Sequence, residues 1–107
     1  MTDSLVERLL AQVGGVRDGA LLRFSIGNAY LGDGSYAEAA AAFRDALGFD
    51  PAYSAAWKLL GKALLAVDDE AGAADAWRQG IATASGRGDV QAAKEMTVFL
   101  NRLSRNG

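Results

Sequence analysis

The chain contains no cysteine and no histidine, and this double absence excludes several kinds of chemistry. Disulfide bonds cannot form, and neither a thiolate nor an imidazole is available as a metal ligand. A cysteine nucleophile and a histidine general base are excluded for the same reason. We therefore expect no metal, no cofactor and no catalytic residue. An enzyme would have to build its site from scattered carboxylates, lysines, serines and tyrosines, so we interpret the protein as non-enzymatic.

Aromatic residues and proline are also scarce. Only 8% of the 107 residues are aromatic, although half are hydrophobic, and Pro51 is the single proline. Alanine is abundant, and alanine has the highest helix propensity and a low preference for strands. The composition therefore predicts closely packed helices in one domain with one core.

Charge and hydropathy restrict the partners and the location. The net charge is −2, whereas a dedicated nucleic-acid-binding protein normally has a basic excess. The first thirteen residues include Asp3, Glu7 and Arg8, which makes them too charged for a signal peptide. No stretch approaches the roughly 20 apolar residues of a membrane span. We expect a cytoplasmic protein that binds neither nucleic acid nor membranes.

Capping and turn signals divide the chain into six helical segments. Ser4 with Glu7 and Ser35 with Glu38 have the spacing of a capping box, and Asp18 is a plausible N-cap for the second helix. We expect helices over 4–14, from about 19 to 31, from 35 to 49, 53–66, 70–84 and 89–104. Residues 85–88 should form a loop, and residues 104–107 should fray.

An internal repeat of 34 residues is the most informative feature of the chain. Gly27 returns as Gly61, and Phe43 is matched by Trp77 at the same spacing. Ile26 with Leu60 and Ala39 with Ala73 keep this register. A fixed period of this length is typical of helical repeat arrays. Because Gly27 and Gly61 lack side chains, we expect Phe43 and Trp77 to pack against the bare backbone there.

This pattern resembles the tetratricopeptide repeat (TPR) family, whose units are pairs of antiparallel helices. The resemblance places one unit at 20–53 and a second at 54–87, between an N-terminal helix at 4–14 and a C-terminal capping helix at 89–104. It implies an all-α, right-handed superhelix of antiparallel helix pairs, with about six helices in a single domain over 1–107. The apolar face of the capping helix should cover Trp77, while Glu95, Asn101 and Arg102 should face water.

The sequence departs from the family pattern at three positions. Arg23 occupies the place that Trp57 occupies in the second unit, and Gly80 and Ser85 stand where the first unit has Ala46 and Pro51. Gly80 keeps its site small, so we expect the helix pair to be retained.

The resemblance also implies a function, because first helices in this family line a concave groove that accepts a peptide. The corresponding residues here include Leu21, Phe24, Asn28, Lys58, Lys62 and Leu65. Lys58 and Lys62 are four residues apart and share one helix face. We therefore predict that the groove binds a partner peptide that is acidic or carries a C-terminal carboxylate.

Three alternatives remain open. Some family members grip a terminal carboxylate with a lysine and asparagines, but Phe24 and Leu59 depart from that set and only Asn28 matches it. Lys58 and Lys62 would be ordinary solvated charges if nothing binds there. Independently, Phe24 would pack against the first helix if it is not a groove residue. Alternatively, the module serves self-association, as a weak homodimer instead of the expected monomer.

Overall fold

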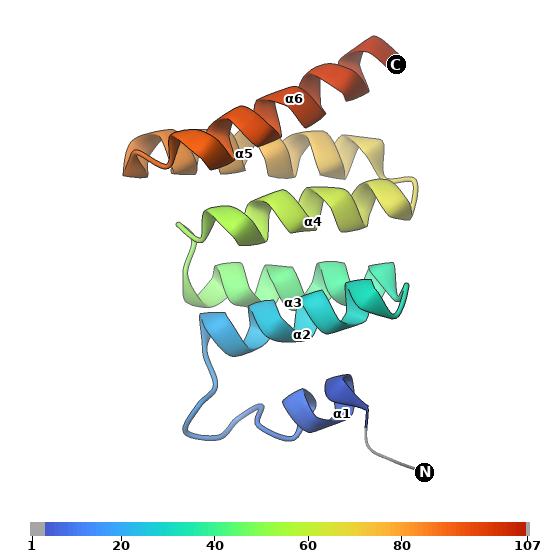
Figure 1. Ribbon diagram of the computed structural model, residues 1–107, viewed down its shortest axis with the longest axis vertical. Helices are drawn as coiled ribbons and strands as arrows, with labels where there is room; N and C mark the ends of the chain where they lie inside the picture. Colours follow the sequence, from blue (N-terminus) through green and yellow to red (C-terminus); the bar gives the residue numbers. More distant parts are fainter. Residues whose placement is uncertain (1–3, 107) are drawn as a thin grey trace.

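The computed structural model describes residues 4–106, and within that range all the regular secondary structure is α-helical (Figure 1). Its helices are α1 (Leu5–Leu10), α2 (Ala20–Gly32), α3 (Tyr36–Phe49), α4 (Ser54–Ala66), α5 (Glu70–Arg87) and α6 (Val90–Asn106). The predicted all-α fold of six helices is confirmed. None of the helices in this range combines the length and the apolar character that crossing a membrane requires.

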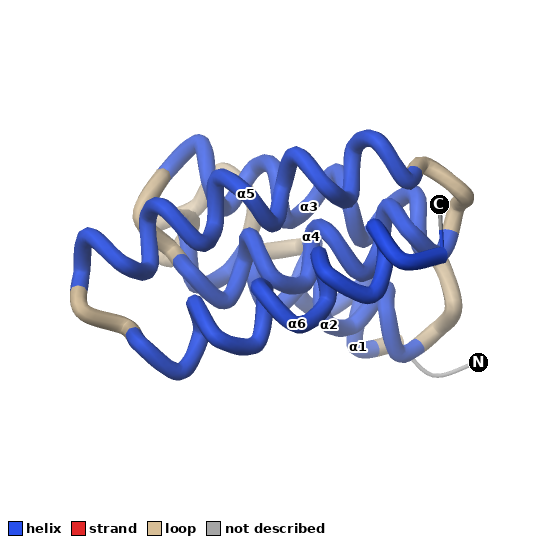
Figure 2. Tube along the Cα trace, turned by 90° about the horizontal axis from the view of Figure 1, so that it is seen from above, coloured by secondary structure: helices blue, strands red, loops and turns tan. Residues whose placement is uncertain are grey.

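The helices stack into an elongated body of 45 × 28 × 18 Å. Each helix contacts the next one in the chain, and α4 also contacts α6. Seen from above, α3 and α5 lie on one side and α2 and α6 on the other, with α4 between them in this view (Figure 2). The second helices α3 and α5 therefore share one side of the array, and we call α2, α4 and α6 together the layer of first helices.

The two repeat glycines are buried where the sequence places the closest helix contacts. A methyl group on Gly27 would overlap the ring of Phe43, and one on Gly61 would overlap the indole of Trp77. Phe43 and Trp77 are almost completely buried. The expected approach of the rings to bare backbone is confirmed, and it compensates for the roughly 1 kcal/mol that a glycine costs inside a helix.

The N-terminal segment is less helical than predicted. Helix α1 ends at Leu10, and residues 11–17 form turns instead of completing a helix to residue 14. The N-cap of α2 is Gly19, not Asp18. The Asp18 carboxylate instead accepts hydrogen bonds from the backbone N–H groups of Gly14 and Gly19 and from the guanidinium of Arg23. These bonds connect the loop to α2.

One of the two predicted capping boxes lacks its defining hydrogen bond. The Ser4 hydroxyl accepts from the Glu7 backbone N–H at 3.0 Å, as expected. Ser35 occupies the N-cap position of α3, but its side chain makes no capping hydrogen bond. Tertiary contacts through Ala39 and Phe43 hold the start of α3 without that cap.

The C-terminal helices are longer than predicted. Helix α5 continues through the expected loop to Arg87 and ends at Gly88, which adopts the left-handed conformation with φ of 77°. Residues 104–106 are helical instead of frayed, and residue 107 of that prediction lies outside the described residues. Ser85 explains the extension of α5, because a proline at the equivalent Pro51 disfavours helical geometry in the preceding residue and Ser85 does not.

The longer α5 changes the register of the next helix. Helix α4 begins 34 residues after α2, whereas α6 begins 36 residues after α4. Helix α6 is also inclined to α4, and its carboxyl-terminal half diverges from it (Figure 1). The apolar side of α6 covers Trp77 as predicted, since the Phe99 ring lies 5.4 Å from the indole.

Candidate functional site

The six predicted groove residues lie on the layer of first helices. We call this surface the first-helix face, and it comprises Leu21, Phe24 and Asn28 of α2 and Lys58, Lys62 and Leu65 of α4. Leu21 is 71% exposed and Leu65 is 39% exposed. Asn28 and Lys62 are also exposed, whereas Phe24 and Lys58 are half-buried. The layer therefore presents both apolar and polar groups to a partner.

Phe24 is held in place by aromatic neighbours. Its ring stacks on Tyr53 with centroids 4.7 Å apart, and it lies 5.6 Å from the ring of Phe43 in a tilted arrangement. Neither neighbour belongs to α1, and the aromatic contacts of Phe24 lie within the first unit, whose last residue is Tyr53. Burial raises the pKa of the Tyr53 hydroxyl, with the Asp50 carboxylate as a smaller cause. Phe24 is thus a rigid apolar group with part of its surface accessible.

The two predicted lysines differ in their partners. The Lys58 ammonium lies 3.4 Å from a carboxylate oxygen of Glu95 on α6. Glu95 was expected to face water, and this half-buried ion pair corrects that expectation. The Lys62 ammonium lies 4.7 Å from the centroid of the Phe99 ring in a cation–π contact. Within residues 4–106, no carboxylate comes within 4 Å of the Lys62 ammonium, so it is free to meet an anion from outside.

Helix α6 extends the first-helix face, which the sequence reasoning missed. With the 36-residue offset, Gln91, Lys94 and Val98 correspond to Ala55, Lys58 and Lys62 of α4. Gln91 and Lys94 are exposed, and Val98 is 45% exposed. With a strict 34-residue period, Gln91, Lys94 and Val98 would not align with Ala55, Lys58 and Lys62 of α4. The absence of a proline at Ser85 is the sequence signal that could have revealed the shift.

Charge is segregated between the two layers. Helices α2, α4 and α6 carry one acidic residue, Glu95, and six basic residues, namely Arg23, Lys58, Lys62, Lys94, Arg102 and Arg105. Helices α3 and α5 carry four acidic and three basic residues. A chain of net charge −2 therefore concentrates positive charge on the layer that contains the first-helix face.

Two depressions of similar size border α4 and α5. One of about 430 Å³ lies where α4, α5 and α6 meet and is lined by Lys62, Leu65, Glu70, Trp77, Phe99, Arg102 and Leu103. The other, of about 440 Å³, lies among α3, α4 and α5 with Arg44, Asp75 and Gln79 among its polar lining residues. Only the first contains predicted site residues. In the part of the chain that the structure describes, no cluster of three or more carboxylates is placed to hold a metal ion.

A stacked array of helix pairs, with small residues at the helix contacts and a mixed apolar and basic face, defines a helical-repeat protein. The family model described as Tetratricopeptide repeat matches residues 4–54 and 24–89, and the chain belongs to this family. TPR repeats are generally protein–protein interaction modules, and the family is generally non-catalytic.

Close relatives share almost the whole length of the chain. TPR repeat-containing protein PA0015 of Pseudomonas aeruginosa is 54% identical over 100 residues, covering 94% of this chain and 92% of the relative. The solution structure of protein BPP2914 from Bordetella parapertussis has a TM-score of 0.84 at 46% identity, covering 98% of this chain and 91% of that one. The crystal structure of MamA has a TM-score of 0.69 at 17% identity, covering 94% and 65% respectively, and shows the shared fold alone.

Proposed function

We propose that the protein is a non-enzymatic module that binds an acidic peptide segment of a partner protein along the first-helix face. The concentration of basic side chains on this layer is the observation that carries the proposal. Lys62 and Lys94 are exposed on neighbouring helices, so they would present positive charge to the same extended segment. Such exposed charges favour association and selectivity more than tight binding, and salt screens them.

The α2 part of the face would recognise the peptide by other contacts. Phe24 offers an apolar surface that Tyr53 and Phe43 already hold in one orientation, so little side-chain entropy is lost on binding. The exposed Asn28 amide can both donate to and accept from a peptide backbone. The chemistry of the face therefore changes from neutral on α2 to basic on α4 and α6.

A titration followed by backbone amide shifts tests this function. We expect an acidic peptide to perturb amides on α2, α4 and α6, and the double variant Lys62→Met/Lys94→Met should weaken its binding several-fold. Lys58 is left intact because it pairs with Glu95. Arg78→Met, which removes an exposed positive charge from α5, is the matched control and should change the affinity little. If acidic peptides leave all three helices unperturbed, the proposal is wrong.

Self-association is the second candidate function, and one observation favours it. The N-terminal end of the array exposes several apolar side chains, with Leu5 at 54%, Leu10 at 42%, Val13 at 40% and Val16 fully exposed. An exposed apolar patch at the end of an array can pair with a second copy. Sedimentation over a range of concentrations separates the candidates, because a monomer at every concentration argues against self-association.

A further inference from the structure

We infer that the 430 Å³ pocket between α4, α5 and α6 receives one large apolar side chain of the partner peptide, and that Lys62 and Arg102 bind an acidic side chain next to it. The inference rests on the proposed function and adds the type of residue that the partner must carry. It also places the anchor at the carboxyl ends of α4 and α6, away from the aromatic cluster of Phe24, Phe43 and Tyr53.

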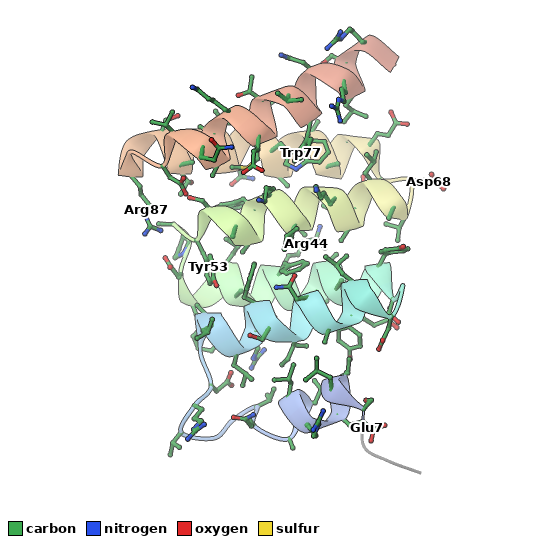
Figure 3. The ribbon with its side chains drawn as sticks, in the orientation of Figure 1. Glu7, Arg44, Tyr53, Asp68, Trp77 and Arg87 are labelled. Carbon is green, nitrogen blue, oxygen red and sulfur yellow. The ribbon has the colours of Figure 1, made fainter. Side chains whose placement is uncertain are left out.

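The walls of the pocket are apolar and fixed. Leu65, Trp77, Phe99 and Leu103 supply the walls. The Trp77 indole N–H donates to the Lys58 carbonyl at 3.1 Å, and its ring lies against Phe99, so it sits between α4 and α6 (Figure 3). Because the single donor of the indole is already used, the Trp77 part of the lining has no free polar group. Such a surface favours an apolar occupant, since a buried polar group would be left without a partner.

The charges around the pocket favour an anion beside that occupant. Lys62 and Arg102 line the pocket from α4 and α6, and Glu70 lines it from α5. Neither cation has a carboxylate within 4 Å in the described range 4–106, and the Lys62 ammonium rests on the Phe99 ring. A carboxylate that enters between α4 and α6 would meet two positive charges, whereas the α5 side would repel it.

The size and position of the pocket point to a peptide side chain. A volume of about 430 Å³ is near the lower end of the range of about 300–1,000 Å³ that is usual for ligand pockets. It has room for a leucine or aromatic side chain but not for a folded element. Lys62 and Leu65 belong both to the pocket and to the first-helix face, so a peptide lying on that face can insert a side chain here.

Trp77 provides a direct reporter for the test. The chain has two tryptophans, and Trp57 does not line this pocket, so Trp57→Phe leaves Trp77 as the only indole. Circular dichroism checks that this variant is folded. An acidic peptide with both ends blocked, in which leucine adjoins glutamate, should change the Trp77 emission. Peptides with alanine in place of leucine, or with glutamine in place of glutamate, should bind at least about five-fold more weakly, since about 1 kcal/mol corresponds to that factor.

Protein variants identify the cations. Lys62→Met and Arg102→Gln should each weaken binding of the leucine–glutamate peptide several-fold. The affinity for the peptide with glutamine in place of glutamate should stay nearly unchanged. Lys94→Met, which removes an exposed cation of α6 outside the pocket, is the control and should affect both peptides equally.

The outcomes separate this inference from the proposed function. If acidic peptides perturb the first-helix face but leave the Trp77 emission unchanged, or bind equally with alanine in place of leucine, the pocket is not the anchor and the proposed function still holds. Binding that requires a free C-terminus would also overturn the inference, because the anion would then be the terminal carboxylate. If no acidic peptide binds at all, both proposals fail.

Discussion

The two repeat units solve the same structural problem with different side chains. At the fourth position of the first unit, Arg23 binds Asp18 and Asp45 through its guanidinium and lies over the Phe49 ring. At the same position of the second unit, the Trp57 indole N–H donates to the Pro51 carbonyl at 2.9 Å. Both side chains tie the start of a first helix to an adjoining segment of chain. At both positions a long side chain with a donor makes this contact, through ion pairs in the first unit and through an indole in the second.

The units also differ on the surface that they offer to a partner. The first unit presents Leu21, Phe24 and Asn28, which carry no charge, and the second presents Lys58 and Lys62. The buried positions of the two units are similar in character, with Gly27 beside Phe43 and Gly61 beside Trp77. The comparison shows that the helix contacts constrain the buried positions, whereas the exposed face is free to vary.

The closest helix contact should be the most sensitive point of this comparison. Gly61→Leu must displace the Trp77 ring and break its hydrogen bond to Lys58, so we expect the free energy of unfolding to fall by more than about 2 kcal/mol. The loss in free energy of unfolding should be about 1 kcal/mol smaller for Gly27→Leu than for Gly61→Leu, because the Phe43 ring has no hydrogen bond to lose. Urea denaturation measures both differences.

Gly48→Ala provides the control for these substitutions. A methyl group on Gly48 meets no atom within 4 Å, so this change in α3 should be neutral or stabilise by up to about 1 kcal/mol. An unchanged denaturation midpoint for Gly61→Leu would show that packing of the Trp77 ring does not need the bare backbone at Gly61.

Acid should weaken the first unit more than the second. Hydrogen bonding to the Arg23 guanidinium, followed by the Gly14 N–H, lowers the pKa of Asp18 from 3.8 to about 2. Because the pKa is lower in the folded state, the stabilisation is present above pH 3.8 and is lost as the pH falls toward 2. Asp18→Asn should therefore lower the melting temperature at pH 6 and change it much less at pH 2.

The cause of this pH dependence can be checked with a second substitution. Arg23→Met removes the principal partner of Asp18, so adding Asp18→Asn to it should change the melting temperature far less at pH 6. Equal effects of Asp18→Asn with and without Arg23 would contradict the assignment.

The smallest expected effect concerns the ion pair that joins the second unit to α6. Lys58 and Glu95 are partly exposed, so their coupling in a double-mutant cycle of Lys58→Met and Glu95→Gln should be below about 1 kcal/mol. Thermal unfolding at low and high salt measures it, and the coupling should shrink in high salt. A coupling of several kcal/mol would mean that α6 depends on this pair more than on the packing of Met96 and Phe99.

Most of the fold could be predicted from the sequence, because the signals that define it are local. Pro51 marks a helix end, and the return of Gly27 as Gly61 sets the period of the array. The cap at Asp69, which accepts from the Gly72 N–H at 2.9 Å, is another local contact of this kind. The predicted end of the first helix at residue 14 was wrong, since α1 ends at Leu10, and no local signal shows that Asp18 binds Gly14 and Arg23 instead of capping α2.

The candidate site was only partly predictable. The resemblance named residues on α2 and α4, which are the first helices of the two units. The resemblance did not show that the Lys58 ammonium already pairs with the Glu95 carboxylate, whereas the Lys62 ammonium contacts the Phe99 ring. Gln91, Lys94 and Val98 were missed because their register depends on how far α5 continues.

The sequence by itself determined that the chain forms stacked helix pairs, since periodic small and large residues admit close packing in only one register. Tertiary structure alone decided which charges remain available and where an apolar side chain can enter. Those properties depend on the distances between α4, α5 and α6, and these distances follow from side chains far apart in the sequence, such as Lys58 with Glu95 and Trp77 with Phe99.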